Sequence, residues 1–207
     1  MASVTRKKSP GSRAERRDQI RLALLSAVEE MLDEGEGFTE ISVERLVSRA
    51  DMSRSTFYVY FEDKGDLLKA WLSDIVTQLS EAAKTWWTLP ADATRQDLRA
   101  ALMEIVEIYR PHTTLMAAVY DAAAYEPGLR EEVDRMMAGN IAGLRKHIKQ
   151  GQAGGSIHTD LPPDETAAWL QWMAERGLHQ LIRAASDSEV ESLVDAWSGI
   201  VWYSLYA

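Results

Sequence analysis

Apolar side chains recur every three or four positions through most of the chain, which is the pattern of amphipathic helices. The first such segment covers residues 14–34 and ends before Gly35, because glycine tolerates the left-handed backbone that closes a helix. A short helix then begins at Ser42, and another begins at Ser53 and runs to about Tyr60. Each serine hydroxyl can accept a hydrogen bond from a free backbone N–H at the helix start. The pattern predicts three short or medium helices at the start of the chain.

Six further helices, most of them longer, are predicted after residue 62. Asp63 caps the first, and the pairs Thr94 with Asp97 and Ser188 with Glu191 have the spacing of capping boxes. Glycine-rich residues 151–155 are expected to form a loop. Prolines, which interrupt or start helices, stand at Pro111, Pro127, Pro162 and Pro163. With no convincing strand or internal repeat, the predicted fold class is all-α with about nine helices.

Residues 41–68 contain two short helices separated by a tight turn, the arrangement of a helix-turn-helix whose second helix enters a DNA major groove. At about 100° per residue, Phe57 and Phe61 share one side of the second helix and should anchor it in the core. The side chains left on the outer face and its flanks are Arg54, Ser55, Thr56, Tyr58, Val59 and Tyr60. Their hydroxyls and guanidinium suit base edges and phosphate oxygens, and Lys64 in the next helix could meet a phosphate.

This segment resembles the TetR family of one-component transcriptional repressors over about residues 14–72. The resemblance rests on an ordered set of residue types at positions 41–43, 46–47, 50–53, 55–61 and 64–68. Asp51 departs from the pattern, because the family usually has glycine in the turn, and aspartate tolerates that backbone better than most residues. Ser55 stands where the family often carries glycine or proline. The resemblance implies a three-helix DNA-binding domain whose contacts are Ser42, Ser53, Arg54, Ser55, Thr56, Tyr58, Tyr60 and Lys64.

Residues 73–207 resemble the family's helical ligand-binding and dimerisation domain. Weaker similarity at residues 172–176 and 200–206 links the chain to the ethionamide-activation repressor subgroup. The resemblance implies a cavity for an elongated apolar effector, although Met and Trp at helical spacing are by themselves more typical of a core. Its implied wall is Leu98, Leu102, Ile105, Tyr109, Met116, Tyr120, Met137, Asn140, Leu144, Gln171, Glu175 and Leu178. The polar members of that set could orient a ligand.

The last helix carries an apolar stripe, and the resemblance implies that the last two helices of each subunit form a four-helix dimer interface. The stripe consists of Trp197, Ile200, Val201 and Leu205. The alternative is that these side chains only cover the chain's own core. A homodimer is expected because helix-turn-helix readers usually bind two half-sites one helical turn apart.

Charge divides the chain into a cationic arm and an acidic body, although the formal net charge is −9. Residues 1–21 hold seven basic and two acidic side chains. Alone, such a run is typical of a solvated tail, but before a DNA-binding domain it could add phosphate or minor-groove contacts. The predicted division is a basic disordered arm over 1–13, a helix-turn-helix domain over 14–72 and a ligand-binding and dimerisation domain over 73–207.

Several classes of protein are disfavoured by what the sequence lacks. Without cysteine there is no disulfide, thiol catalysis or Cys-ligated zinc. The longest uncharged run, residues 196–207, is shorter than the roughly 20 residues of a membrane helix. None of the four histidines follows a glutamate by three positions, and HExxH, phosphate-loop and nucleophile-elbow motifs are missing. We therefore expect a cytoplasmic protein with no membrane partner, no metal, no cofactor and no enzymatic activity.

These observations predict a homodimeric repressor that leaves a near-palindromic double-stranded DNA operator when an apolar small molecule binds. The alternative is a helical small-molecule-binding or scaffold protein without DNA binding, which would show an apolar or acidic outer face on helix 53–60. Activation in place of repression stays open, as do the operator sequence, the effector, the regulated genes and whether the cavity is open in the free protein.

Overall fold

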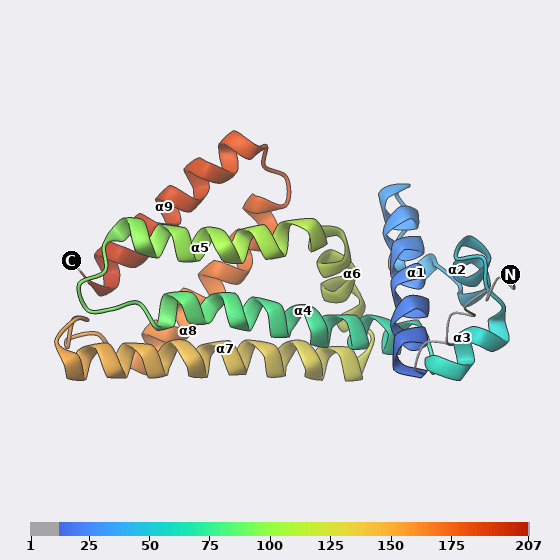
Figure 1. Cartoon of the computed structure of the whole chain (residues 1–207), viewed down its shortest axis with the longest axis horizontal. Helices are drawn as coiled ribbons and strands as arrows, with labels where there is room; N and C mark the ends of the chain where they lie inside the picture. The colour runs from blue at the N-terminus through green and yellow to red at the C-terminus, as the bar shows by residue number, and fades with distance from the viewer. Residues whose placement is uncertain (1–12, 207) are drawn as a thin grey trace, which may run out of the picture. The chain divides into compact units, whose positions relative to one another are not determined.

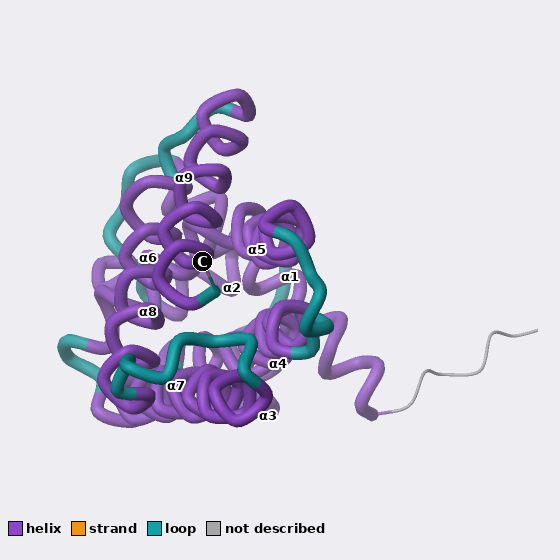
Figure 2. Tube along the Cα trace, turned by 90° about the vertical axis from the view of Figure 1, so that its left-hand side faces the viewer, coloured by secondary structure: helices purple, strands orange, loops and turns teal. Residues whose placement is uncertain are grey.

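The computed structural model describes residues 13–206, and the predicted basic arm lies, except for Arg13, outside the described residues. Within that range the chain forms nine α-helices and no strand (Figures 1 and 2). The helices are α1 (Arg13–Asp33), α2 (Val43–Arg49), α3 (Arg54–Tyr60), α4 (Lys64–Trp87), α5 (Arg95–Tyr109), α6 (Thr113–Ala123), α7 (Pro127–Gly154), α8 (Pro163–Gly177) and α9 (Asp187–Leu205). Three short segments join them: the 3₁₀ helices η1 (Phe38–Glu40) and η2 (Arg110–His112), and the π-helical η3 (Leu178–Ile182). The all-α prediction is confirmed.

The helix starts expected from the sequence are largely those observed. The Ser42 hydroxyl accepts a hydrogen bond from Arg45 N at 3.3 Å, and the Ser53 hydroxyl accepts one from Thr56 N at 3.1 Å. Asp63 begins α4 in the same way by accepting from the backbone N–H of Asp66. The predicted capping box of Thr94 with Asp97 is also present. These caps form because a short polar side chain precedes each amphipathic segment.

Two sequence predictions about helix ends were wrong. The expected loop over residues 151–155 is instead the last turn of α7, which closes at Gly155 with a φ of +77°. Gly151 is needed there for packing, because a Cβ atom at this position would lie 2.5 Å from Ile157 Cδ1. Helix α9 is capped by Ser186 with Glu189 and not by Ser188 with Glu191, since both pairs share one spacing and the earlier pair captures the helix start.

The chain divides into two compact units, Met1–Leu67 and Leu68–Ala207, and the boundary falls in the first turn of α4. In the first unit, Phe57 and Phe61 are 0% and 2% exposed, as predicted, with ring centroids 5.7 Å apart. They fix α3 against the other buried apolar side chains of this unit, among them Leu24, Met31, Ile41 and Leu46.

In the second unit, α7 packs along α8 and α5 packs along α9. Fully buried Leu98, Leu102, Val194, Val201 and Leu205 form part of one continuous apolar core. None of the described helices is both long and apolar enough to cross a membrane.

Candidate DNA interface and ligand cavity

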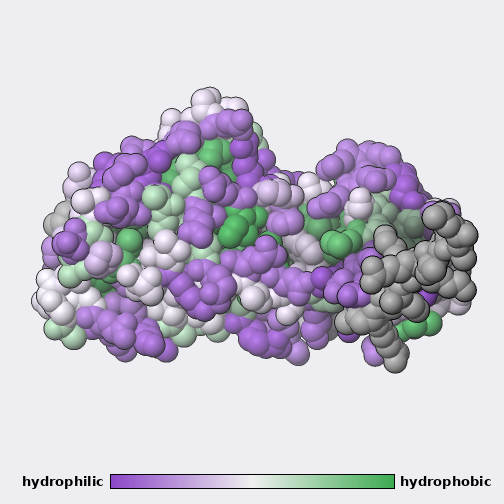
Figure 3. Space-filling model, in the orientation of Figure 1, coloured by the Kyte–Doolittle hydropathy of each residue, from purple (hydrophilic) through white to green (hydrophobic). Residues whose placement is uncertain are grey.

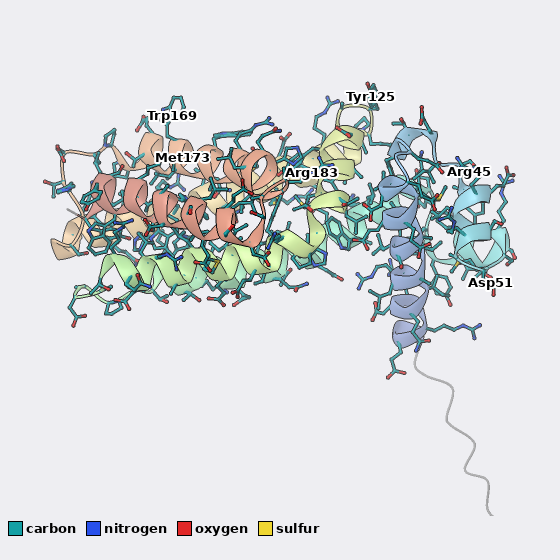
Figure 4. All side chains as sticks on the ribbon, turned by 90° about the horizontal axis from the view of Figure 1, so that it is seen from above. Arg45, Asp51, Tyr125, Trp169, Met173 and Arg183 are labelled. Carbon is teal, nitrogen blue, oxygen red and sulfur yellow. The ribbon has the colours of Figure 1, made fainter. Side chains whose placement is uncertain are left out.

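The turn between α2 and α3 depends on one strained residue, Asp51, which lies in the region shown on the right of Figure 4. Its φ is +51°, the left-handed backbone that the family's usual glycine would adopt without cost. Backbone N–H groups of Asp51 and Met52 donate to the carbonyl oxygens of Ser48 and Val47, which closes the end of α2. The turn therefore keeps helix-turn-helix geometry although it contains aspartate where the family usually has glycine.

The outward face of α3 is polar and accessible, as the sequence predicted. Arg54 and Ser55 are exposed, Tyr58 and Val59 are 47% and 64% exposed, and Thr56 and Tyr60 are partly exposed. At the start of the helix, the Ser53 hydroxyl lies 2.8 Å from the hydroxyls of both Ser55 and Thr56. This small hydroxyl cluster offers donors and acceptors in a fixed arrangement.

Arg54 is held in place by two neighbours while remaining accessible. Its guanidinium pairs with the Glu44 carboxylate and lies 5.6 Å from the centroid of the Tyr58 ring. The Tyr58 hydroxyl, followed by the charge of Glu44, raises the pKa of Arg54. A guanidinium ordered in this way has lost part of its rotamer freedom before any partner arrives.

Lys64, predicted to meet a phosphate, is engaged differently. Its ammonium group donates to the backbone carbonyl oxygens of Phe38, Thr39 and Ile41 at 2.6, 3.0 and 2.9 Å. It also lies 4.8 Å from the centroid of the Phe38 ring. Lys64 therefore ties the start of α4 to η1, and its three ammonium hydrogens are directed at carbonyl groups.

The second unit contains a narrow, partly open cavity of about 70 Å³ that α4 to α9 all line. Ten of the twelve predicted wall residues line it: Ile105, Tyr109, Met116, Tyr120, Met137, Asn140, Leu144, Gln171, Glu175 and Leu178. Leu98 and Leu102 do not, which corrects the prediction: both are 0% exposed and belong to the apolar core beside α9.

Sequence reasoning missed a side of this cavity that comes mainly from α4. The additional wall residues are Leu79, Ala83, Trp86, Trp87, Met136, Ala174 and Trp197. The four from α4 recur at three- and four-residue spacing, so extending the apolar period of that helix to its end would have found them.

Three polar atoms in the cavity wall are buried without a hydrogen-bond partner among the described residues. They are Nε1 of Trp87, the hydroxyl of Tyr109, a residue 3% exposed, and Oε2 of Glu175, a residue 6% exposed. Burial, followed by the charge of Glu175, raises the pKa values of Tyr109 and Tyr120. Outside the wall, His179 packs edge-on against the Tyr120 ring at 5.0 Å, and burial lowers its pKa. The wall is thus mostly apolar with a small polar cluster set into it.

The predicted dimer stripe divides into two kinds of residue. Val201 and Leu205 are 0% exposed and belong to the chain's own core, so their prediction as dimer contacts was wrong. They lie one turn apart on the inward side of α9, whereas Ile200 is 52% exposed. Trp197 is partly buried and lines the cavity.

Apolar side chains are exposed on both α8 and α9. Figure 3 shows apolar surface over α9 among polar residues, and Figure 4 shows Trp169 projecting away from α8. The exposed members are Trp169, Trp172, Ile200 and Tyr203, with exposures of 77%, 49%, 52% and 67%. An apolar groove of about 430 Å³, bounded in part by Leu181 and Ile200, runs between η3 and α9.

Each of the two units matches known transcriptional regulators in sequence. Residues 24–71 match the family profile described as bacterial regulatory proteins of the tetR family, and residues 98–207 match that of the transcriptional regulator EthR, C-terminal domain. The HTH-type transcriptional regulator EthR of Mycobacterium tuberculosis (strain ATCC 25618 / H37Rv) is 30% identical over 178 residues, covering 86% of this chain and 82% of that protein. The regulator of the same name from Mycolicibacterium smegmatis is 24% identical over 214 residues, covering 99% and 98%.

Solved structures share the fold at lower identity. A putative TetR-family transcriptional regulator from Syntrophomonas wolfei has a TM-score of 0.69 at 18% identity, covering 92% of this chain and 96% of that one. A TetR transcription regulator from Haloarcula marismortui has a TM-score of 0.73 at 16% identity, covering 93% and 99%. These relatives are described as transcriptional regulators. The chain belongs to the TetR family of DNA-binding transcriptional regulators and is of the EthR type.

Proposed function

We propose that the protein is a homodimeric repressor that leaves a near-palindromic operator when an apolar small molecule enters the cavity of its second unit. The observation that carries this proposal is the narrow, mostly apolar cavity to which α4 contributes Leu79, Ala83, Trp86 and Trp87. The first residues of the same helix belong to the DNA-binding unit. One helix therefore takes part in both functions.

The DNA contacts that we propose follow the outward face of α3. Arg54, Ser55 and Thr56 would meet base edges, because a guanidinium and hydroxyls can read donors and acceptors in the major groove. Phosphate oxygens would be met by the hydroxyls of Ser42, Ser53, Tyr58 and Tyr60. Lys64 would stabilise the fold and would not contact DNA, because three backbone carbonyls bind its ammonium group.

A second copy of the chain is the proposed occupant of the exposed apolar surface on α8 and α9. Trp169, Trp172, Ile200 and Tyr203 would then be buried between subunits. Aromatic residues contribute strongly to such interfaces, and a twofold axis would present two copies of α3 to successive major grooves.

Effector binding would require the cavity to expand. Its volume of about 70 Å³ is small beside the roughly 300 to 1,000 Å³ of typical small-molecule sites. An effector must therefore displace wall side chains, including those of α4, and so favour a different arrangement of that helix. A tenfold loss of operator affinity needs only about 1.4 kcal/mol of coupling between the two sites.

The experiment measures binding of the purified protein to labelled DNA from upstream of its own gene at two salt concentrations. We expect saturable, salt-sensitive binding, and Arg54→Ala should weaken it about tenfold or more, since one good base contact contributes about 1 to 3 kcal/mol. Arg145→Ala removes a partly exposed guanidinium from the second unit and should leave the affinity unchanged. A genome-wide search that finds no preferred DNA sequence would contradict the proposal.

A further inference from the structure

We propose that the effector carries a protonated amine, and that Glu175 binds this ammonium group inside the cavity. The inference rests on the proposed ligand cavity and names the chemical class that its wall would recognise. It distinguishes an apolar amine from a neutral apolar molecule or an apolar acid.

Glu175 is unusual because a carboxylate is set into the wall of an otherwise mostly apolar cavity. Its side chain is 94% buried, and its Oε2 accepts no hydrogen bond among the described residues. Leaving a buried acceptor of this kind without a donor costs stability. Since most buried polar groups are hydrogen-bonded, an unbonded carboxylate oxygen at a cavity suggests that the missing donor belongs to a ligand.

The oxygen atoms beside Glu175 fit an ammonium donor better than a second acid, whereas the unpartnered Nε1 of Trp87 in the same wall can only donate and would not bind an ammonium group. Tyr109 also lines the cavity, and its buried hydroxyl oxygen lacks a partner. Burial and then the charge of the nearby Glu175 carboxylate raise the pKa of Tyr120, so the Tyr120 hydroxyl lies close to that carboxylate. An ammonium group has three donors, so it can meet Glu175 and both tyrosine oxygens at once, and it also neutralises the carboxylate.

Cationic side chains near Glu175 leave its buried Oε2 without a hydrogen bond. Arg176 Nε forms an ion pair with Glu175 Oε2 at 3.4 Å but donates no hydrogen bond to it, and the Arg176 side chain is 65% exposed. Arg183, whose charge acts on Tyr109 and His179, is also exposed. Solvent screens both guanidinium groups, and neither lines the cavity. His179 has a pKa lowered mainly by burial, so it adds no positive charge near neutral pH.

The test uses three probes of equal length: octylamine, octan-1-ol and octanoate, each titrated calorimetrically into the full chain at pH 7. We expect octylamine to bind about tenfold to a hundredfold more tightly than octan-1-ol, which is the range of one charge-assisted hydrogen bond. Octanoate should bind most weakly. Glu175→Gln keeps the shape of the side chain, so it should abolish the preference for the amine and retain octan-1-ol binding.

A matched control is Glu165→Gln, which removes an exposed carboxylate from the same helix and should keep the preference for octylamine. Thermal unfolding of both variants checks that the second unit is folded. Equal affinity for octylamine and octan-1-ol would overturn the inference and leave the proposed apolar cavity standing. Binding of none of the probes would overturn both. Selective octylamine binding that does not release operator DNA would support the inference and overturn the proposed release mechanism.

Discussion

The two units of the chain treat their polar side chains in opposite ways. Along the recognition helix they are accessible and bonded to each other, as in the contacts of Ser53 with Ser55 and of Arg54 with Glu44. Around the cavity they are buried and partly unbonded, as in Tyr109 and Glu175. The difference fits the proposed functions, which need a DNA-reading surface formed in advance and a cavity that a ligand would complete.

The largest effect should come from breaking the core under the recognition helix. Phe57→Ala removes a fully buried ring, and such truncations cost about 3 to 5 kcal/mol. We expect α3 to lose its position and DNA affinity to fall below detection. All seven tryptophans lie in the second unit, so unfolding followed by tryptophan fluorescence should change little.

A variant in the core of the second unit tests whether the two units unfold separately. Leu102→Ala truncates the core of the second unit and should shift the tryptophan transition to lower temperature. If Phe57→Ala shifted that transition equally, the two units would unfold as one, and the contrast between them would not extend to stability.

Local features of the two units could be predicted from the sequence, because they depend on neighbouring residues. The caps at Ser42 and Ser53 and the inward face of Phe57 follow from helix geometry and short-range hydrogen bonds. Asp51 is similar, since a turn of this length forces one residue into the left-handed region.

Features that depend on which surface a helix packs against could not be predicted in the same way. The period of α9 groups Val201 with Ile200, but it does not tell whether each side chain meets its own core or a partner. For the same reason, the resemblance placed Leu102 in the cavity wall, whereas the structure places it in the core. Nor does any pattern reveal that Oε2 of Glu175 is buried without a hydrogen-bond donor, because burial is a property of the packed helices.

Acidification should have an intermediate effect on the stability of the second unit, because this unit contains partly buried histidines. His147 Nδ1 faces the carbonyl oxygen of Trp87 at 3.1 Å, so that nitrogen carries the hydrogen and Nε2 accepts from the Tyr206 hydroxyl at 2.6 Å. Trp86 Nε1 donates to the same hydroxyl at 2.9 Å. Protonating Nε2 would direct a second donor at the Tyr206 oxygen. Consistently, burial lowers the pKa of His147, although the hydrogen bond with Trp87 opposes this.

The sign of the pH dependence follows from that lowered pKa. Below the unfolded value of about 6.5, the unfolded chain binds the proton more readily than the folded chain. The free energy of unfolding should therefore fall as pH drops through 6.5, by at most about 1.4 kcal/mol per pH unit for one histidine, and level off below the folded pKa. His112 and His179, whose pKa values burial also lowers, act in the same direction.

Tryptophan-detected unfolding in urea at pH 7.5, 6.5 and 5.5 measures this loss. His147→Gln should reduce the slope, whereas His158→Gln serves as the comparison at a histidine outside this hydrogen-bond network. A free energy that stays constant or rises between pH 6.5 and 5.5 would show that the buried histidines are accommodated in their charged form.

The smallest effect should come from the exposed pair beside the recognition helix. Glu44 and Arg54 are 68% and 59% exposed, so solvent screens their pairing and it contributes little to stability. Glu44→Gln should leave unfolding nearly unchanged. It removes a negative charge close to the proposed phosphate contacts and frees Arg54 from its counter-ion, so affinity for non-operator DNA should rise a few-fold.

This last change tests whether preorganisation of Arg54 serves selectivity. If Glu44 holds the guanidinium in the orientation that reads a base, Glu44→Gln should raise non-specific binding more than operator binding and narrow the ratio between them. Anisotropy titrations with operator and scrambled duplexes over a range of salt concentrations separate the two terms. Glu62→Gln makes the same charge change in the first unit outside the pair. If both variants gained the same affinity for both duplexes, Glu44 would act only through its charge. The pairing of Arg54 with Glu44 would then not contribute to sequence selectivity.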